Sequence, residues 1–255
     1  MLDTIQHRFS LLDPFITAYG PADKSRRPAV LLFHACNGVR EHIHAYAQQV
    51  ADLGFRAYVV DSFTPRGWDE NAAMSLVCTG LALHGYERSG DVLAAIWGLG
   101  QRPEVDAGNI ILAGWSHGGW AIMDLMTEKL TREGEARLRD PTPAPMKGVK
   151  GVCLVYPYVN FPARSNMHSW QYAPKTLAVL ARQDFLTSHS HADHIFSHLK
   201  AEGLPVERLD LDCTHCFDED SALHFGPLMA YDRRSHEKTM AAFEGFVKGI
   251  FAQGA

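Results

Sequence analysis

A serine flanked by glycines, Gly114-x-Ser116-x-Gly118, is the pattern in this sequence that most clearly could do chemistry. The apolar run 110–113 precedes the motif, and residues 121–126 follow it with apolar side chains at helical spacing. A strand, a sharp turn and a helix form the setting in which this motif holds a serine hydroxyl clear of the backbone. The N-terminus of the helix also directs amide N–H groups toward negative charge that develops beside the serine. The pattern therefore predicts that Ser116 is a nucleophile.

A serine hydroxyl is a poor nucleophile at neutral pH and needs a base, which a carboxylate in turn orients. In a parallel sheet of this kind the acid and then the histidine follow the serine, each after the carboxyl end of a later strand. Asp184 comes shortly after the apolar run 176–181, and His215 comes shortly after the run 206–211. We therefore predict that His215 is the catalytic base and that Asp184 orients it.

Other roles remain open for both partners of the serine. Asp184 could cap the helix that follows it, although Thr187 or Ser188 suits that position better. His215 could be a loop histidine or a metal ligand. Three further acids compete with Asp184 for this role. Asp193 falls inside a predicted helix, and Asp210 and Asp212 lie on or beside the predicted strand before His215.

A serine nucleophile that attacks a carbonyl also needs two backbone amides that face the developing oxyanion. The residue after the nucleophile, His117, supplies one amide by position. The loop after the apolar run 29–34 reads His-Ala-Cys-Asn-Gly, and Cys36 is the candidate for the second amide. Cys36 as a nucleophile in its own right is disfavoured, because the sequence offers it no dedicated base.

The chain resembles the dienelactone hydrolase family of α/β-hydrolases over nearly its whole length. The matching segments are Leu32-Phe33-His34-Ala35-Cys36-Asn37-Gly38, Val60-Asp61-Ser62-Phe63-x-Pro65-Arg66-Gly67, Gly114-x-Ser116-His117-Gly118-Gly119, Asp184, and His215-x-Phe217-Asp218. The resemblance implies a triad that acts on esters or lactones without a cofactor. Well-studied members carry a cysteine nucleophile and a nearby glutamate, whereas this chain has Ser116 and Ala35 at those positions. This departure favours a serine esterase mechanism with an acyl-enzyme intermediate.

A histidine-rich segment offers an alternative chemistry. His189, His191, Asp193 and His194 match the zinc-binding pattern of metallo-β-lactamase-like hydrolases. Only residues 195–255 follow the motif, whereas that fold needs a strand-rich N-terminal half and further ligands well downstream. We therefore expect a solvated histidine-rich helix face and no metal, and we keep a metal-dependent hydrolase as an alternative. A non-catalytic binding protein with the same fold is a further alternative.

Two other groups of residues have open roles. Cys213 and Cys216 form a C-x-x-C pair, which we interpret as loop thiols near the site because it lacks the setting of a redox motif. Arg66 could bind a substrate carboxylate or pair with an Asp or Glu. Segments 62–79 and 157–175 are irregular and rich in aromatics, and we expect them to form a lid or pocket. The predicted substrate-binding residues are Phe63, Arg66, Trp68, Trp115, Tyr156, Tyr158 and Phe217.

The elements that must position these residues alternate along the chain. Strands are predicted at 29–34, 55–61, 109–113, 151–156, 176–181 and 206–211, with an edge hairpin within 5–20. Helices are predicted around Tyr46 and over 83–99, 189–199 and 237–251. This order predicts one α/β-hydrolase domain over residues 1–255, with a mostly parallel, doubly wound sheet of about eight strands flanked by helices.

Composition restricts the partners and the compartment. The 255 residues carry a net charge of −5 without a long basic run, which argues against nucleic acid or an anionic membrane as a partner. No stretch approaches the roughly 18 apolar residues of a membrane span, and the N-terminus lacks the apolar region of a secretory signal. Five scattered cysteines indicate mostly reduced thiols. We expect a cytoplasmic monomer or homodimer that binds a small ester or lactone.

Overall fold

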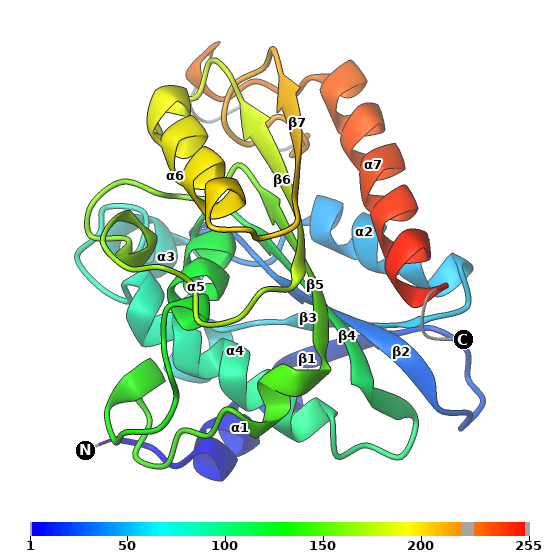
Figure 1. The fold of residues 1–255 in the computed structure, drawn as a ribbon. Coiled ribbons are helices and arrows are strands. Elements are labelled where there is room, and N and C mark those ends of the chain that lie inside the picture. The colour runs from blue at the N-terminus through cyan, green and yellow to red at the C-terminus, as the bar shows by residue number, and fades with distance from the viewer. Residues whose placement is uncertain (1, 221–226, 253–255) are drawn as a thin grey trace.

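A seven-stranded sheet forms the centre of the computed structural model, which describes residues 2–220 and 227–252 (Figure 1). The strands lie in the order β1-β3-β2-β4-β5-β6-β7, and all neighbours are parallel except β1 and β3. The mostly parallel sheet is confirmed; the described residues form seven strands in place of about eight. The strands are β1 (Ile16–Tyr19), β2 (Arg27–Phe33), β3 (Arg56–Val60), β4 (Val105–Trp115), β5 (Val149–Val155), β6 (Lys175–Ala181) and β7 (Val206–Leu211).

The missing strand belongs to the predicted N-terminal hairpin. Its first half is a helix, α1 (Ile5–Leu12), which begins where the Thr4 side chain accepts a hydrogen bond from the His7 N–H. Ile5 and Leu12 are buried and lie seven residues apart, so they share one helix face. The prediction that the hairpin within residues 5–20 begins with a strand was therefore wrong, because short apolar runs fit both the helical and the strand periodicity.

Helices cover both faces of the sheet (Figure 1). One apolar core joins the sheet to α2 (Glu41–Asp52) and α7 (Arg233–Phe251). The other core joins it to α1 and to three further helices. Consecutive residues of β2 divide between the two cores, which is why the strand reads as a continuous apolar run. The three further helices are α4 (Gly85–Leu99), α5 (His117–Met126) and α6 (His189–Ala201).

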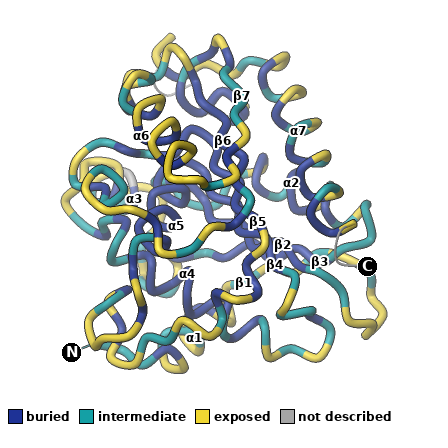
Figure 2. The backbone as a smooth tube through the Cα atoms, in the orientation of Figure 1, coloured by how far each residue is buried: buried dark blue, intermediate teal, exposed yellow. Residues whose placement is uncertain are grey.

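Burial follows the same layers. Strands β2 to β6 are buried along most of their length, the edge strands β1 and β7 are partly exposed, and loops and outer helix faces are exposed (Figure 2). The remaining helices are short: α3 (Glu70–Leu76) and the 3-10 turns η1 (Asp13–Phe15), η2 (Thr64–Arg66), η3 (Glu135–Arg137), η4 (Ala144–Gly148) and η5 (Arg164–Asn166). None of the described helices is long and apolar enough to cross a membrane.

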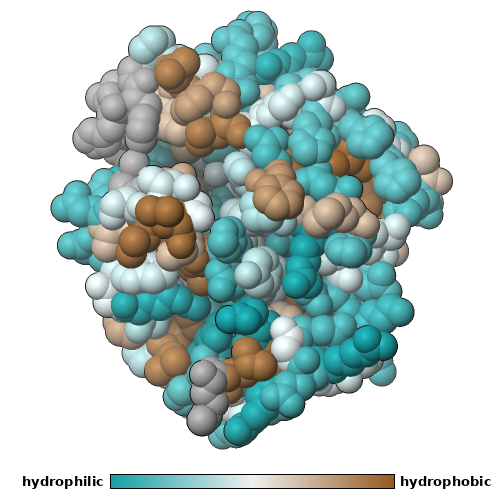
Figure 3. All heavy atoms as spheres, turned by 90° about the vertical axis from the view of Figure 1, so that its left-hand side faces the viewer, coloured by the Kyte–Doolittle hydropathy of each residue, from teal (hydrophilic) through white to brown (hydrophobic). Residues whose placement is uncertain are grey.

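The two predicted lid segments expose several apolar side chains. Leu81 beside the first segment is 76% exposed, and Phe161 and Met167 in the second are 79% and 61% exposed. The face of the molecule shown in Figure 3 carries its brown, apolar atoms in separate groups among hydrophilic ones. Separate groups of this kind are ordinary for a protein surface and do not define a docking face.

One disulfide ties the first lid segment to the sheet. Cys36, just after β2, is bonded to Cys78, just after α3. The other three cysteines are free and buried. Three of the five thiols are thus reduced, as predicted, whereas the single disulfide was not predicted, because its members lie 42 residues apart without any spacing signal.

Candidate active site

The backbone turns sharply at Ser116, between the end of β4 and the start of α5. Ser116 has φ 46° and ψ −108°, a conformation that non-glycine residues rarely adopt. A Cβ at Gly114 would lie 2.6 Å from the backbone of residues 118 and 119, and one at Gly118 would lie 2.1 Å from the Phe33 carbonyl oxygen. The glycines thus permit the close approach of β2, β4 and α5 that holds the serine at the carboxyl edge of the sheet.

The structure brings the three predicted catalytic side chains into one hydrogen-bonded chain. His215 Nε2 lies 2.8 Å from Ser116 Oγ, and His215 Nδ1 lies 2.6 Å from Asp184 Oδ2. Because the carboxylate only accepts, Nδ1 carries the proton and Nε2 is free to accept from the serine hydroxyl. Ser116 and His215 are only 5% and 1% exposed, so this chain is shielded from bulk water.

Asp184 also organises the loop in which it lies. Its Oδ1 atom accepts hydrogen bonds from the N–H groups of Leu186 and Thr187, both at 2.9 Å. The competing acids bond elsewhere: Asp193 pairs with Arg208, and Asp210 lies 2.7 Å from a nitrogen of His189. The carboxylate of Asp212 accepts from Gln183 at 2.7 Å. Among the proposed acids, Asp184 is thus the one in contact with the histidine.

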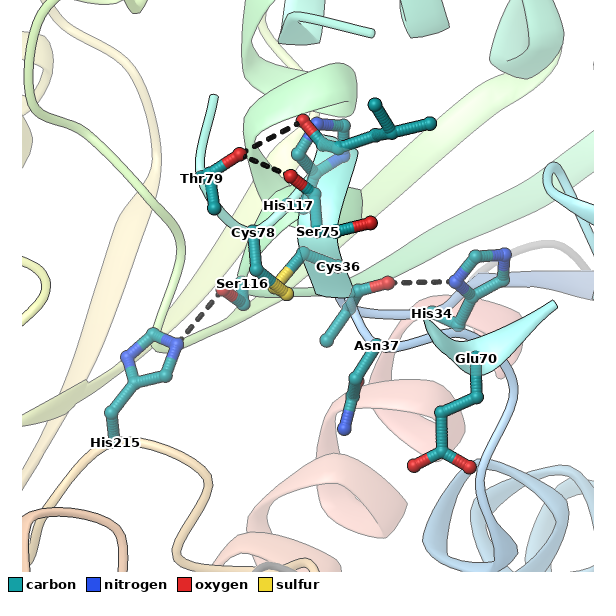
Figure 4. Close-up of a disulfide and its surroundings, with 12 residues drawn as sticks. His34, Cys36, Asn37, Glu70, Ser75, Cys78, Thr79, Ser116, His117 and His215 are labelled. Atoms are coloured by element: carbon teal, nitrogen blue, oxygen red, sulfur yellow. Dashed lines mark hydrogen bonds between the residues drawn. A yellow bond between two sulfur atoms is a disulfide. The ribbon is translucent and has the colours of Figure 1, made fainter. Parts of the chain in front are cut away.

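The loop after β2 lies beside the serine. Figure 4 shows His215 on one side of Ser116 and the Cys36–Cys78 disulfide on the other. Within the described chain, the backbone N–H groups of Cys36 and His117 donate to no protein acceptor. Both amides are therefore available to an oxyanion that forms at Ser116.

The His34 ring fixes the orientation of one of these amides. Its Nε2 accepts from the Ser62 N–H at 3.1 Å, so its protonated Nδ1 donates to the Ala35 carbonyl at 2.7 Å. Burial, reinforced by the Arg88 charge, lowers the pKa of His34 to about 3 and keeps the ring neutral. The C=O and N–H of a trans peptide point in opposite directions, so holding the Ala35 carbonyl also fixes the Cys36 N–H.

A buried carboxylate to which the sequence analysis gave no role lies beneath the site. Asp218 accepts from the indole N–H of Trp115 at 2.9 Å and from the hydroxyls of Tyr46 and Tyr156 at 3.1 and 2.5 Å. It thereby joins the residue before the nucleophile to the loop that carries His215. The only signal in the sequence was its place in the His215-x-Phe217-Asp218 match.

Comparison with known proteins relates this geometry to a family. Residues 16–136 match the model of the dienelactone hydrolase family. The resemblance predicted from the motifs is thereby confirmed. The match includes Ser116 and both oxyanion candidates, whereas Asp184 and His215 lie beyond it and depend on the geometry described above. No curated protein sequence matches the chain.

Solved structures extend the likeness to nearly the whole chain. A dienelactone hydrolase-like promiscuous phosphotriesterase, P91 from metagenomic libraries, is 19% identical, with a TM-score of 0.71 over 92% of this chain and 99% of its own. Esterase 2 of Thermogutta terrifontis, phosphonylated by cyclosarin, is 16% identical, with a TM-score of 0.66 over 92% and 88%. Est1E of Butyrivibrio proteoclasticus with ferulic acid bound is 14% identical, with a TM-score of 0.61 over 93% and 96%. These likenesses confirm the α/β-hydrolase fold.

Several predicted substrate-binding residues have other contacts in this dienelactone hydrolase-like chain. Trp115, Tyr156 and Phe217 are at most 1% exposed, and the first two bond to Asp218, so they support the site from beneath. This placement differs from the predicted pocket lining. The sharp turn after β4 and the loops after β5 and β7 bury these rings where the sequence shows only aromatics in loops.

The remaining substrate-binding candidates lie in the two lid segments. Arg66 donates to both oxygens of the buried Asp91 at 2.9 and 3.0 Å, which is the ion-pair alternative to a substrate carboxylate. Phe63 is buried and packs with the half-buried Trp68. Tyr158 is half-buried, and its hydroxyl donates to the Phe161 carbonyl. Of the aromatic candidates in these segments, Trp68 and Tyr158 are partly exposed.

The histidine-rich segment forms the start of α6, and its side chains diverge. His191 bonds to Asn160, while His194 stacks on His198. Among residues 2–220 and 227–252, no three His, Cys, Asp or Glu side chains are grouped to hold a metal ion. His189 and Asp193 have the partners given above, so the proposed zinc motif is divided among separate contacts.

Proposed function

We propose that the chain is a serine hydrolase that cleaves a carboxylic ester or lactone through Ser116, His215 and Asp184. The observation that carries the proposal is the continuous hydrogen-bonded chain from Asp184 to the serine hydroxyl, with the serine on a strained turn. The family match over residues 16–136 supports the same class of chemistry. The proposal needs neither a metal nor an organic cofactor.

The geometry supports a two-step acyl transfer. His215 Nε2 takes the Ser116 proton as Oγ attacks the carbonyl carbon, and the resulting oxyanion accepts from the amides of Cys36 and His117. Asp184 stabilises the imidazolium that forms. The imidazolium then returns its proton to the leaving alcohol, which yields an acyl-enzyme. His215 next activates a water molecule, and the attack of this water releases the acid.

The first experiment compares wild type with Ser116→Ala on a short p-nitrophenyl ester, a lactone and an amide. We expect the variant to lose ester hydrolysis and to keep the wild-type melting transition. Ser190→Ala, an exposed serine of α6, is the matched control and should retain full activity. Retained hydrolysis by Ser116→Ala would contradict the proposal.

Two further measurements separate the alternatives. A metal-dependent hydrolase would lose activity on chelation and regain it with zinc, whereas the proposed serine hydrolase is unaffected. A non-catalytic binding protein would not react with a fluorophosphonate probe, whereas the proposed enzyme is labelled at Ser116 only. The Thermogutta esterase whose fold is similar is described as phosphonylated, which makes an organophosphorus probe a reasonable choice.

A further inference from the structure

Arg88 is a fully buried cation in the first turn of α4, and it faces the carboxyl edge of the sheet. Its Nη1 atom donates to the His34 carbonyl at 2.8 Å and lies 3.1 Å from His117 Nδ1. Its Nε atom donates to the Ser62 hydroxyl at 3.0 Å. One guanidinium thus contacts the segments after β2, β3 and β4.

These contacts determine which nitrogen of the His117 ring carries the proton. A guanidinium can only donate, so Nδ1 of His117 must accept and Nε2 must carry the proton. That proton is donated to the Leu83 carbonyl at 2.6 Å. Burial and the Arg88 charge hold the pKa of His117 well below its ordinary value. The ring is therefore neutral and held on both sides.

The contacts of Arg88 with the His34 carbonyl and the His117 ring involve the two segments that carry the candidate oxyanion amides. His117 carries one amide on its own backbone, and its ring is held by Arg88. The His34 carbonyl begins the short loop that carries the other amide, at Cys36. We propose that Arg88 is a positioning residue that sets the separation of these two amides. The inference rests on the proposed function, because it assumes an oxyanion at Ser116.

Packing alone does not account for a guanidinium at this position. A buried charge destabilises a fold relative to a well-packed apolar side chain unless its hydrogen bonds are complete. Arg88 Nη2 has no hydrogen-bonding partner among the described residues. The nearby Asp91 pairs with Arg8 and Arg66, and among the described residues Arg88 forms no ion pair of its own. Burial lowers the pKa of Arg88 to about 9, so it remains a cation at neutral pH.

The first variant is Arg88→Met, which removes every donor and keeps an apolar stem. Removal of one hydrogen-bond donor from an oxyanion hole reduces kcat by about 100- to 1000-fold. A displaced donor is a milder defect, so we expect kcat to fall by roughly 10- to 100-fold with KM changed less than about threefold. A trifluoromethyl ketone, which forms an oxyanion with the serine, should bind more weakly by the same factor as kcat/KM falls.

Two variants keep the test decisive if Arg88→Met folds poorly. Arg88→Gln retains N–H donors without the charge, and we expect an intermediate kcat and an intermediate inhibitor affinity. Arg8→Met is the matched control, because it removes another guanidinium from the same buried network without touching either loop. It should lower the melting temperature while leaving kcat and inhibitor affinity unchanged.

Three outcomes would overturn the inference. These are wild-type kcat in both Arg88 variants, an equal loss of kcat in Arg8→Met, and a loss of kcat without weaker inhibitor binding. Failure of the proposed function gives a different result, since wild type itself would then show no Ser116-dependent turnover.

Discussion

At the scale of single residues, Asp184 has two tasks that use different oxygens. Oδ2 orients His215, and Oδ1 accepts the two amides of its own loop. An asparagine can keep the second task through its carbonyl oxygen. Its amide nitrogen would instead donate to His215 Nδ1, which forces the proton onto Nε2 and leaves no acceptor for the serine hydroxyl.

We therefore expect Asp184→Asn to lower kcat by roughly 10³- to 10⁴-fold, as a wrong histidine tautomer does in other triads. The loop contacts survive, so the melting temperature should stay near that of wild type. Steady-state kinetics and thermal melting check both expectations. Asp193→Asn, at an exposed competing acid, is the control, and a greater loss of activity there than in Asp184→Asn would reject the assignment.

The contacts among Ser116, His215 and Asp184 could be predicted because each residue follows its own apolar run in a fixed chain order. Arg88 and Asp218 could not be predicted. Their partners come from segments far away in the sequence, such as Trp115 for Asp218, and no local pattern marks such contacts. Residue type alone also placed Tyr156 on the pocket wall, whereas its hydroxyl bonds to a buried carboxylate.

At the scale of elements, the close packing of α5 against the end of β2 positions the serine. Gly118→Ala would place a methyl group 2.1 Å from the Phe33 carbonyl oxygen, so either β2 or the turn must shift. We expect at least a tenfold loss of kcat/KM and a lower melting temperature. Gly245→Ala, inside α7 with open space around the site, should be neutral or stabilising by about 0.5–1 kcal/mol. Equal effects of the two substitutions would contradict this view of the turn.

The Cys36–Cys78 disulfide joins the loop after β2 to the segment after α3. Closing a loop over 42 residues stabilises a fold by about 4 kcal/mol in the chain-entropy model. We expect Cys78→Ser to lose roughly 2–4 kcal/mol of unfolding free energy in urea and to lower kcat, because Cys36 carries one of the two proposed oxyanion amides.

Reductant should lower the unfolding free energy and kcat of wild type to the values of Cys78→Ser. It should leave both quantities unchanged in Cys78→Ser itself. Cys153→Ser, at a free buried thiol, tests whether loss of any cysteine has the same effect. Five reactive thiols in the denatured, unreduced chain would refute the disulfide. The predicted cytoplasmic location stays a prediction, and a persistent disulfide is unusual in that compartment.

At the scale of the whole molecule, strands from both halves of the chain share one sheet, and we propose that residues 1–255 fold as one domain. The parallel strands could be predicted because long apolar runs buried on both faces have few alternatives. The N-terminal helix α1 could not be predicted. Its burial depends on the packing of Phe9 over Gly98 in α4, and α4 lies far along the chain.

The stability of this domain should depend on pH through Asp124, a fully buried carboxyl of α5. Its Oδ1 accepts from the Arg164 N–H at 2.7 Å in the second lid segment, and the Trp120 side chain and the Tyr86 backbone also face this carboxyl. Burial raises the pKa of Asp124 from 3.8 to about 7. Between these values the folded chain keeps a proton that the unfolded chain has lost, so the unfolding free energy falls as pH rises.

Asp124→Asn removes this dependence and keeps an acceptor for the Arg164 N–H. The variant should therefore gain stability relative to wild type as pH rises from about 4 to 7, by up to roughly 4 kcal/mol. Above the pKa of Asp124 in the folded chain, the difference in unfolding free energy between the variant and wild type should become constant. Urea unfolding at several pH values measures it, with Glu133→Gln on an exposed loop as the control. If the difference between Asp124→Asn and wild type does not change with pH, the buried carboxyl is not the group that titrates.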